Sequence, residues 1–256
     1  MSEIKLSAVI ITYNEEKNIA RCLDSLQGVA DEIIVIDSHS TDKTESIARA
    51  YGVIFIEKDW DNFSLAKNFG VSKATYDYIL SLDADEALSQ ELKNALLEEK
   101  KDNEFQAYYL KRLTQYCGKW IRHCGWYPDY KIRLWDRNLG KWQGTVHETL
   151  QFNKALAVGK LHGDLLHYSF NSIKEHIDKA NRFSEISAKE VVQEGKKVTI
   201  IYHLVLNPLF TFVSKYIFRL GFLDGYYGFI ICVISAFSNF LKYSKIRALS
   251  KANHHY

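Results

Sequence analysis

The fold class is decided by an apolar run that ends in polar residues, Leu6-Ser7-Ala8-Val9-Ile10-Ile11-Thr12-Tyr13-Asn14. A short apolar run that stops in this way is typical of a strand buried on both faces. Residues 15–26 follow with apolar side chains at helical spacing, and Asn14 is predicted to cap that helix at its amino end. The stretch therefore predicts a strand followed by a helix, the first half of a βαβ unit.

The same alternation of strand and helix continues to residue 100. Further strands are predicted at 33–36, 53–56 and 78–82, and further helices at 41–51, 63–73 and 89–100. Successive units of this kind form right-handed crossovers and a mostly parallel sheet covered by helices. The predicted fold class is α/β.

From about Phe105 the pattern changes to strands joined by longer loops, among them 107–110 and 131–135. We expect these strands to extend the sheet and to build the acceptor side of a cleft. A polar helix is predicted at 172–194, with an apolar face made of Ile173, Ile177, Ala180 and Phe183. The predicted division is a catalytic domain at 1–170, with a nucleotide half (1–100) and an acceptor half (101–170), and a helical region at 171–256.

The last third is apolar but interrupted by polar residues, and its longest uninterrupted stretch, 226–237, is short for a membrane span. Basic residues between Lys215 and Lys251 flank the apolar stretches, a pattern that fits amphipathic helices lying on an anionic membrane surface. Two other interpretations remain open: core helices that pack on the catalytic domain, and a dimer contact. We expect a peripheral association with the membrane.

Composition excludes some partners and favours a compartment. A formal net charge of +2 over 256 residues gives no argument for nucleic acid. The four cysteines show no CxxC pairing, and the first residues do not resemble a signal peptide. We therefore expect a cytoplasmic protein with free thiols.

Polar residues follow three of the predicted strands. In an open α/β sheet, ligands bind beyond the carboxyl ends of the strands. Those ends carry Thr12-Tyr13-Asn14-Glu15, Asp37-Ser38-His39-Ser40-Thr41-Asp42 and Asp83-Ala84-Asp85-Glu86. Neighbouring carboxylates such as Asp83 and Asp85 suit Mg²⁺ or Mn²⁺, which typically joins carboxylates to a substrate diphosphate. The alternative is an acidic cap for the helix that begins near Ser89, which explains one acid more easily than three.

No GxGxxG and no GxxxxGK[ST] motif occurs, so a nucleotide must be held by carboxylates, a metal ion and hydroxyls. The strand-end motifs, together with Leu65-Ala66-Lys67-Asn68-Phe69-Gly70, resemble those of the inverting glycosyltransferase family 2, whose fold is named GT-A. Two further motifs resemble the bacterial branch that glucosylates the heptose of the lipopolysaccharide core: Arg133-Leu134-Trp135-Asp136-Arg137 and Gly144-Thr145-Val146-His147-Glu148. That branch also contains enzymes with other acceptors.

The resemblance implies a role for each matching residue. Asp37 would hydrogen-bond the uracil of a UDP-sugar, and the nucleoside would contact Thr12, Tyr13 and Glu15. Asp83 would face the ribose and the metal, Asp85 would ligate the metal, and His167 is either a further ligand or a buried hydrogen-bonded histidine. Lys67 stands where many relatives carry arginine, and it would neutralise a phosphate or hold an aspartate.

An inverting transfer needs a base for the acceptor hydroxyl and positive charge at the leaving diphosphate. Glu148 is the first candidate base and Asp129 the second, although Glu148 could instead pair with Arg133 or Lys131. The metal, with Lys67 or Arg133, would supply the positive charge.

The resulting hypothesis is transfer of glucose from UDP-glucose to a lipid-linked saccharide, the inner-core heptose of lipopolysaccharide, at the inner face of the cytoplasmic membrane. Two alternatives remain open. One is a family 2 enzyme with another acceptor, such as polyprenyl phosphate, another glycan or a peptide. The other is an inactive GT-A scaffold at the membrane.

Overall fold

The computed structural model describes residues 3–102, 104–144, 148–193 and 199–252. Its contacts divide the chain into two compact units: Met1–Leu113 with Asp129–Tyr168, and Thr114–Pro128 with Ser169–Tyr256. The division predicted from the sequence differs at one point, because residues 114–128 group with the helices of the second unit. Residues 145–147 of the predicted acceptor motif, and the side chain of Lys251, lie outside what the structure describes.

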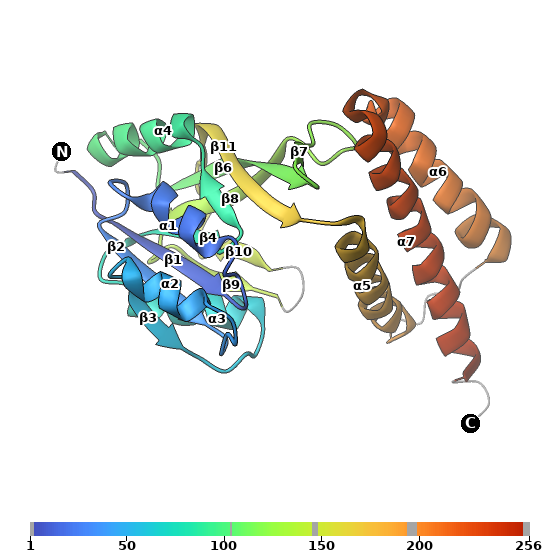
Figure 1. Ribbon diagram of the computed structural model, residues 1–256, viewed down its shortest axis with the longest axis horizontal. Coiled ribbons are helices and arrows are strands. Elements are labelled where there is room, and N and C mark those ends of the chain that lie inside the picture. Colours follow the sequence, from blue (N-terminus) through green and yellow to red (C-terminus); the bar gives the residue numbers. More distant parts are fainter. Residues whose placement is uncertain (1–2, 103, 145–147, 194–198, 253–256) are drawn as a thin grey trace. The chain divides into compact units, whose positions relative to one another are not determined.

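The first unit begins with strands and helices in alternation, as expected (Figure 1). Strands β1 (Leu6–Thr12), β2 (Glu32–Asp37), β3 (Ile54–Glu57) and β4 (Tyr78–Asp83) lie in the order β3-β2-β1-β4, and every pair is parallel. The helices are α1 (Ile19–Leu26), α2 (Thr44–Ala50), α3 (Phe63–Lys73) and α4 (Gln90–Lys101). The α/β fold with its parallel central strands is therefore confirmed.

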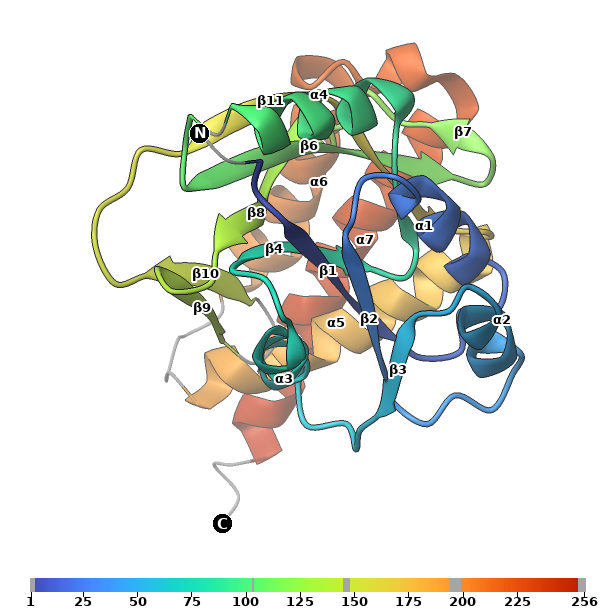
Figure 2. The same ribbon diagram turned by 90° about the vertical axis from the view of Figure 1, so that its left-hand side faces the viewer.

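Alternate side chains of β1 explain the three layers of this unit. Leu6, Ala8 and Ile10 point into one apolar cluster, which α1, α2 and α4 complete. Val9 and Ile11 point into a second cluster, which α3 completes. Figure 2 shows α3 on the side of the sheet opposite α1 and α4. The sheet is buried on both faces, as its continuous apolar strands require.

One short strand before α4 and the strands after residue 105 extend the same sheet. They are β5 (Glu86–Leu88), β6 (Ala107–Tyr116), β8 (Asp129–Asp136) and β11 (Gly159–Phe170), in the order β4-β8-β6-β11-β5, with β7 (Lys119–Trp120) paired to β6. A separate pair is formed by β9 (Gly140–Gln143) and β10 (Thr149–Phe152). Since β8 is antiparallel to β4, its first residue, Asp129, lies at the edge where β4 ends.

The predicted cap at Asn14 is wrong. Asn14 has a left-handed backbone (φ 54°), and α1 begins only at Ile19. The side-chain oxygen of Asn14 instead accepts a hydrogen bond from the backbone N–H of Thr41, 2.7 Å away. A contact with a loop from another strand replaces the local cap, and such a contact leaves no signal in the local sequence.

The second unit is helical. It contains α5 (Ile173–Gln193), η1 (Ile200–Leu206), α6 (Asn207–Val213), η2 (Ser214–Phe218), η3 (Gly221–Asp224) and α7 (Gly225–Ala252). Tyr116, Ile121, Cys124, Ile231 and Cys232 form its core. The apolar face predicted for α5 is only partly buried: Ile173 packs against this core and Ala180 is half-buried. Ile177 and Phe183 are exposed, whereas His176, Ser184 and Ala188 are buried. His176 packs against Tyr116 and Phe170, and α7 is the helix next to α5.

One helix of the described chain, Gly221–Ser250, is long and apolar enough to cross a membrane, judged by length and composition alone. This differs from the expectation that no segment reaches that length, because the helix continues through the polar residues that interrupt the apolar stretch. Only 33% of its most apolar window is buried. The four cysteines are free thiols.

Candidate active site

The carboxyl ends of β1, β2 and β4 lie side by side at one edge of the sheet. The strand register pairs Thr12 with Asp37 and Ile11 with Asp83. Parallel strands end at a common edge, so the polar segments that follow them converge there. The rim predicted from the sequence is present, and it lies entirely within the first unit.

Asp37 organises the loop after β2. Its two carboxylate oxygens accept hydrogen bonds from the backbone N–H of Ser40 (2.7 Å) and from the Ser40 hydroxyl (2.5 Å). The backbone N–H of Asn14 donates to the same hydroxyl at 2.8 Å, which ties the loops after β1 and β2 together. Asp37 is 1% exposed. A carboxylate oxygen can accept more than one hydrogen bond, so the uracil contact of Asp37 stays a prediction.

The end of β1 offers three further groups to this rim. The Thr12 hydroxyl is buried and makes no hydrogen bond to any described residue. Tyr13 is exposed, and Glu15 accepts a hydrogen bond from the Asn18 side chain at 2.7 Å. A buried hydroxyl without a partner is rare in folded proteins and is expected to bind a ligand or water. The nucleoside contacts of Thr12, Tyr13 and Glu15 stay predictions.

Asp83 is held between two cations. Its Oδ1 lies 3.0 Å from Lys67 Nζ, and its Oδ2 accepts a hydrogen bond from Arg133 Nη2 at 2.7 Å. Burial by itself would raise the pKa of Asp83, but the charges of Arg133 and Lys67 hold that pKa well below its usual range. Asp83 is therefore ionised at every pH at which the protein would be used.

Lys67 also holds the first candidate base. Its Nζ donates to Glu148 Oε1 at 2.9 Å. The resemblance implied that Lys67 would either neutralise a phosphate or hold an aspartate. The structure shows a contact with an aspartate, Asp83. Lys67 is completely buried, Arg133 is 3% exposed, and both contact carboxylates. The role of either cation at the leaving diphosphate stays a prediction. Glu148 pairs with Lys67 and not with Arg133 or Lys131, the partners that the sequence suggested.

Helix α3 brings Lys67 to this position and supports the segment that leads to Glu148. A Cβ atom on Gly70 would lie 2.4 Å from a methyl group of Val9, so only glycine lets α3 approach β1 this closely. On another face of α3, Asn68 exchanges two hydrogen bonds with the backbone of Trp142 (2.8 and 3.0 Å). The Ser64 hydroxyl donates to the carbonyl of Gly144 at 2.6 Å.

The other two predicted metal ligands lie together. His167 Nε2 is 3.3 Å from Asp85 Oδ2. The antiparallel pairing of β5 with β11 places His167 opposite Glu86, the residue after Asp85. The second candidate base, Asp129, is held by Arg112, whose Nε and Nη2 donate to Asp129 Oδ2 at 3.0 and 2.7 Å.

Comparison with known proteins identifies the family. The sequence model described as glycosyl transferase family 2 matches residues 7–159, more than half of the chain. The chain belongs to glycosyl transferase family 2. It is 35% identical to an uncharacterised glycosyltransferase of Rickettsia typhi, over 96% of this chain and 88% of the relative. It is 29% identical to the lipopolysaccharide core biosynthesis glycosyltransferase LpsC of Rhizobium meliloti, over 95% of this chain and 92% of the relative.

Among the solved structures to which the chain is similar is a mannosyltransferase from Pyrobaculum calidifontis in complex with GDP-Man and Mn²⁺. It shares 16% identity, covers 98% of this chain and 76% of its own, and has a TM-score of 0.49. The family assignment confirms the enzyme class and the GT-A fold expected from the motifs. The chain is a nucleotide-sugar-dependent glycosyltransferase.

The side chains of this glycosyltransferase fit a divalent cation only if the substrate completes its coordination. Among the described residues, no three His, Cys, Asp or Glu side chains converge well enough to hold an ion by themselves. Asp85 and His167 are close enough to share one, whereas both oxygens of Asp83 face cations. Mg²⁺ and Mn²⁺ are usually held by one or two protein groups together with phosphate oxygens and water, which matches this site.

Sequence reasoning about this glycosyltransferase missed Glu86 and Arg112. Glu86 is completely buried and contacts both Arg133 (2.7 Å) and Arg112 (3.5 Å). The sequence shows Glu86 as the last residue of the Asp83-Ala84-Asp85-Glu86 motif, but the motif predicts no role for it. A signal for Arg112 did exist: a charged residue between the apolar residues of a strand, here Leu110 and Leu113, is expected to have a partner.

Proposed function

We propose that the enzyme inverts the anomeric carbon while transferring a hexose, glucose from UDP-glucose, to a lipid-linked saccharide. The proposed acceptor is the inner-core heptose of lipopolysaccharide or lipooligosaccharide. The observation that carries the proposal is the cluster at the end of β4, where Asp83 is held ionised beside Glu148 and Asp85 lies beside His167. The acceptor class is supported by the similarity to LpsC along nearly the whole chain.

The reaction is a single displacement. The acceptor oxygen forms a bond to the anomeric carbon as the bond from that carbon to the diphosphate oxygen breaks. Glu148 takes the proton of the acceptor hydroxyl, and Asp129 is the second candidate for this role. The contact with Lys67 orients Glu148 in the resting enzyme.

The leaving UDP carries the negative charge that develops in this step. A Mg²⁺ or Mn²⁺ ion held by Asp85 and His167 would stabilise that charge. Asp83 would lie beside the ribose and the metal, and Arg133 and Lys67 keep its carboxylate in place from the protein side. Asp37 would bind the uracil, with Thr12, Tyr13 and Glu15 lining the nucleoside.

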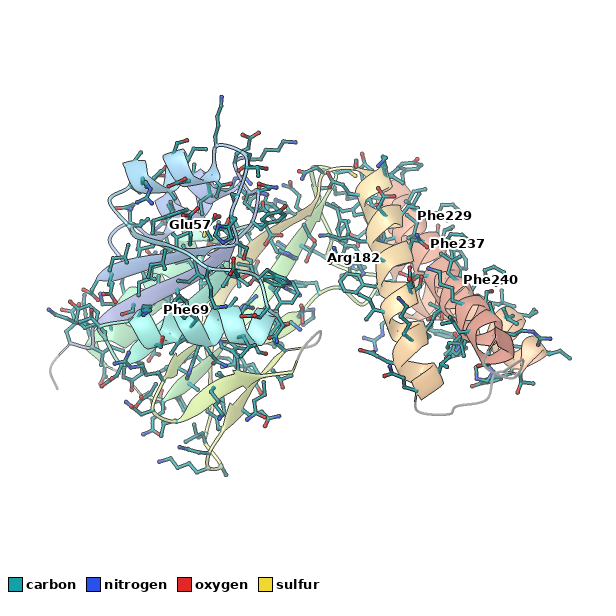
Figure 3. All side chains as sticks on the ribbon, turned by 90° about the horizontal axis from the view of Figure 1, so that it is seen from below. Glu57, Phe69, Arg182, Phe229, Phe237 and Phe240 are labelled. Carbon is teal, nitrogen blue, oxygen red and sulfur yellow. The ribbon has the colours of Figure 1, made fainter. Side chains whose placement is uncertain are left out.

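We place the enzyme peripherally on the inner face of the cytoplasmic membrane, through its second unit. The most exposed large apolar side chains there are Ile201 (69%), Phe210 (68%), Phe218 (73%) and Tyr226 (65%). Phe229, Phe237 and Phe240 follow along α7, each at least 40% exposed (Figure 3). Exposed apolar surface with basic residues nearby, such as Arg219, fits an anionic lipid interface. An acceptor carried on a lipid gives this surface a purpose.

The donor site is tested by calorimetric titration with UDP-glucose, UDP-galactose and UDP-N-acetylglucosamine, with Mn²⁺ or with EDTA. We expect one donor to bind in a metal-dependent way, with affinity falling about 10- to 100-fold in Asp85→Ala. Asp77→Ala is the control, because Asp77 is an exposed carboxylate that pairs with Arg137 just before β4 begins. If no uridine nucleotide binds, the assignment of a uridine-diphosphate donor is wrong.

The acceptor is tested separately with labelled UDP-glucose. Heptose-terminated lipopolysaccharide core, the same core without its lipid, polyprenyl phosphate and a peptide are offered in parallel. We expect label on the lipid-linked core, with inverted anomeric configuration. Label on another acceptor would leave the donor assignment in place and replace the acceptor assignment.

A further inference from the structure

Glu86 lies at the centre of a chain of alternating charges. It is the first residue of β5 and is completely buried. One of its oxygens, Oε1, lies 2.7 Å from Arg133 Nη2 and 3.5 Å from Arg112 Nη1. The other, Oε2, accepts a hydrogen bond from the backbone N–H of Asp83 at 3.0 Å. A buried carboxylate is strongly unfavourable unless it is paired in this way.

Each of the two arginines links Glu86 to a different acid of the site. Arg133 Nη2 is shared, since it donates both to Glu86 and to Asp83, at 2.7 Å each. Arg112 continues to Asp129 on the acceptor side. The buried Glu86 carboxylate therefore lies beside two arginines. Arg133 binds Asp83 on the donor side, and Arg112 binds Asp129 on the acceptor side.

The position of Glu86 is fixed by backbone pairing as well as by charge. β5 is paired with β11, which places Glu86 opposite His167. The carbonyl of Asp85 accepts a hydrogen bond from the backbone N–H of Tyr168 at 2.9 Å. The short turn that carries Asp83 and Asp85 is thus closed at one end by β4 and at the other by β5, and the Glu86 carboxylate bonds back across it to Asp83.

We infer that Glu86 is a positioning residue that sets the places of Asp83 and Asp129 through Arg133 and Arg112, and so aligns the donor and acceptor sides of the site. The inference rests on the proposed function. Glu86 is a second carboxylate partner for Arg133, so that the charge of Arg133 is shared between Glu86 and Asp83. Without this second charge, Arg133 binds Asp83 more strongly and draws its carboxylate away from the ribose and the metal.

Two substitutions test the donor side and the acceptor side separately. In Glu86→Gln we expect the affinity for UDP with Mn²⁺ to fall about 10- to 100-fold and the KM for donor to rise. Arg112→Gln leaves the contact between Glu86 and Arg133 in place. We therefore expect UDP affinity to stay within about twofold of wild type in that variant, while kcat falls or the acceptor KM rises.

The matched control is Glu32→Gln. Glu32 is a half-buried carboxylate that accepts hydrogen bonds from Ser7 and Thr75 at the amino end of β2, away from the carboxyl edge. It reports the effect of removing a bonded carboxylate from the same unit. If the role of Glu86 were purely structural, Glu86→Gln would lower the melting temperature, as we expect for Glu32→Gln. Neither substitution would then change the affinity for UDP.

Equal UDP affinity in Glu86→Gln and Glu32→Gln would overturn the inference. If Glu86→Gln does not fold, Glu86→Asp carries the same test, because it keeps the charge but shortens the reach to Arg133; unchanged UDP affinity there overturns the inference as well. If wild-type protein binds no uridine nucleotide, it is the proposed function that fails. Calorimetry with and without EDTA measures these affinities independently of turnover.

Discussion

Lys67 shows most clearly how single residues define this site. Its ammonium group is completely buried and has carboxylates on two sides, Asp83 at 3.0 Å and Glu148 at 2.9 Å. The ring of Trp142 lies 4.7 Å from it and adds a cation–π contact. Replacing a buried ion pair by apolar groups can be neutral, but removing one partner leaves the others uncompensated.

We expect Lys67→Met to lower the free energy of unfolding by about 3 kcal/mol, because Asp83 and Glu148 lose a shared counter-ion inside the protein. Lys67→Arg keeps the charge and should lose much less. Urea denaturation followed by circular dichroism measures the difference. The control is Lys73→Met on the same helix, where an exposed lysine is expected to change stability by no more than about 0.5 kcal/mol. A loss in Lys67→Met no larger than that would contradict the assignment.

Among the elements, α5 departs most from its sequence pattern. Its more apolar residues, Ile177 and Phe183, are exposed, and a histidine lies in the buried stripe instead. His176 Nδ1 is 3.1 Å from the Tyr116 hydroxyl. Burial lowers the pKa of His176 to about 4, and the charges of Lys179 and Lys215 act in the same direction.

The lowered pKa of His176 predicts a loss of stability in acid. Above pH 6.5 the side chain is neutral in both the folded and the unfolded chain, so its contribution is complete. As the pH falls from 6.5 towards 4, the unfolded chain binds a proton that the folded protein excludes, and stability falls by about 2 kcal/mol at pH 5. His176→Gln removes the titrating group and should flatten this dependence.

Urea midpoints at pH 7 and pH 5 test this prediction. His162→Gln is the matched control, because His162 is an exposed histidine on β11 in the first unit. The same pH dependence in His176→Gln and in wild type would show that His176 does not carry the effect.

On the scale of the whole molecule, chemistry and apolar surface are separated between the units. Every candidate site residue lies in the first unit. The most exposed apolar side chains of the described chain lie in the second, with Phe218 at 73% and Phe210 at 68%. Such a division suits an enzyme whose donor is soluble and whose acceptor is held at a surface.

We expect wild-type protein to sediment with vesicles that contain phosphatidylglycerol, and less so at high salt. The double variant Phe210→Ser/Phe218→Ser should bind at least about tenfold more weakly, because burial of each phenyl ring contributes about 1.5–3 kcal/mol. UDP binding should not change. Trp60→Ser, an exposed aromatic of the first unit, is the control.

Two results would contradict a lipid contact. One is the absence of vesicle binding by the wild-type protein. The other is a wild-type dimer that the double substitution converts to monomers, which would make this face an interface between copies of the chain. Sedimentation and light scattering on the same samples distinguish these outcomes.

Apart from the short strand β5, the order of strands and helices to residue 100 was predictable from the sequence, because apolar periodicity and strand-end polarity are local properties. That order placed Thr12, Asp37 and Asp83 at one edge, since parallel strands must end together. The family motifs pointed to the same residues. Local sequence patterns did not predict which charged side chains pair with one another across the sheet.

Tertiary structure alone decided that Lys67 joins Asp83 to Glu148 and that Glu86 contacts both arginines. These partners come from distant parts of the chain, and which of them meet depends on the strand order β4-β8-β6-β11-β5. The burial of His176 on α5 was likewise decided by its tertiary neighbours, Tyr116 and Phe170. A sequence determines which side chains are available to an element, whereas the neighbours that the fold supplies determine which of them are buried and paired.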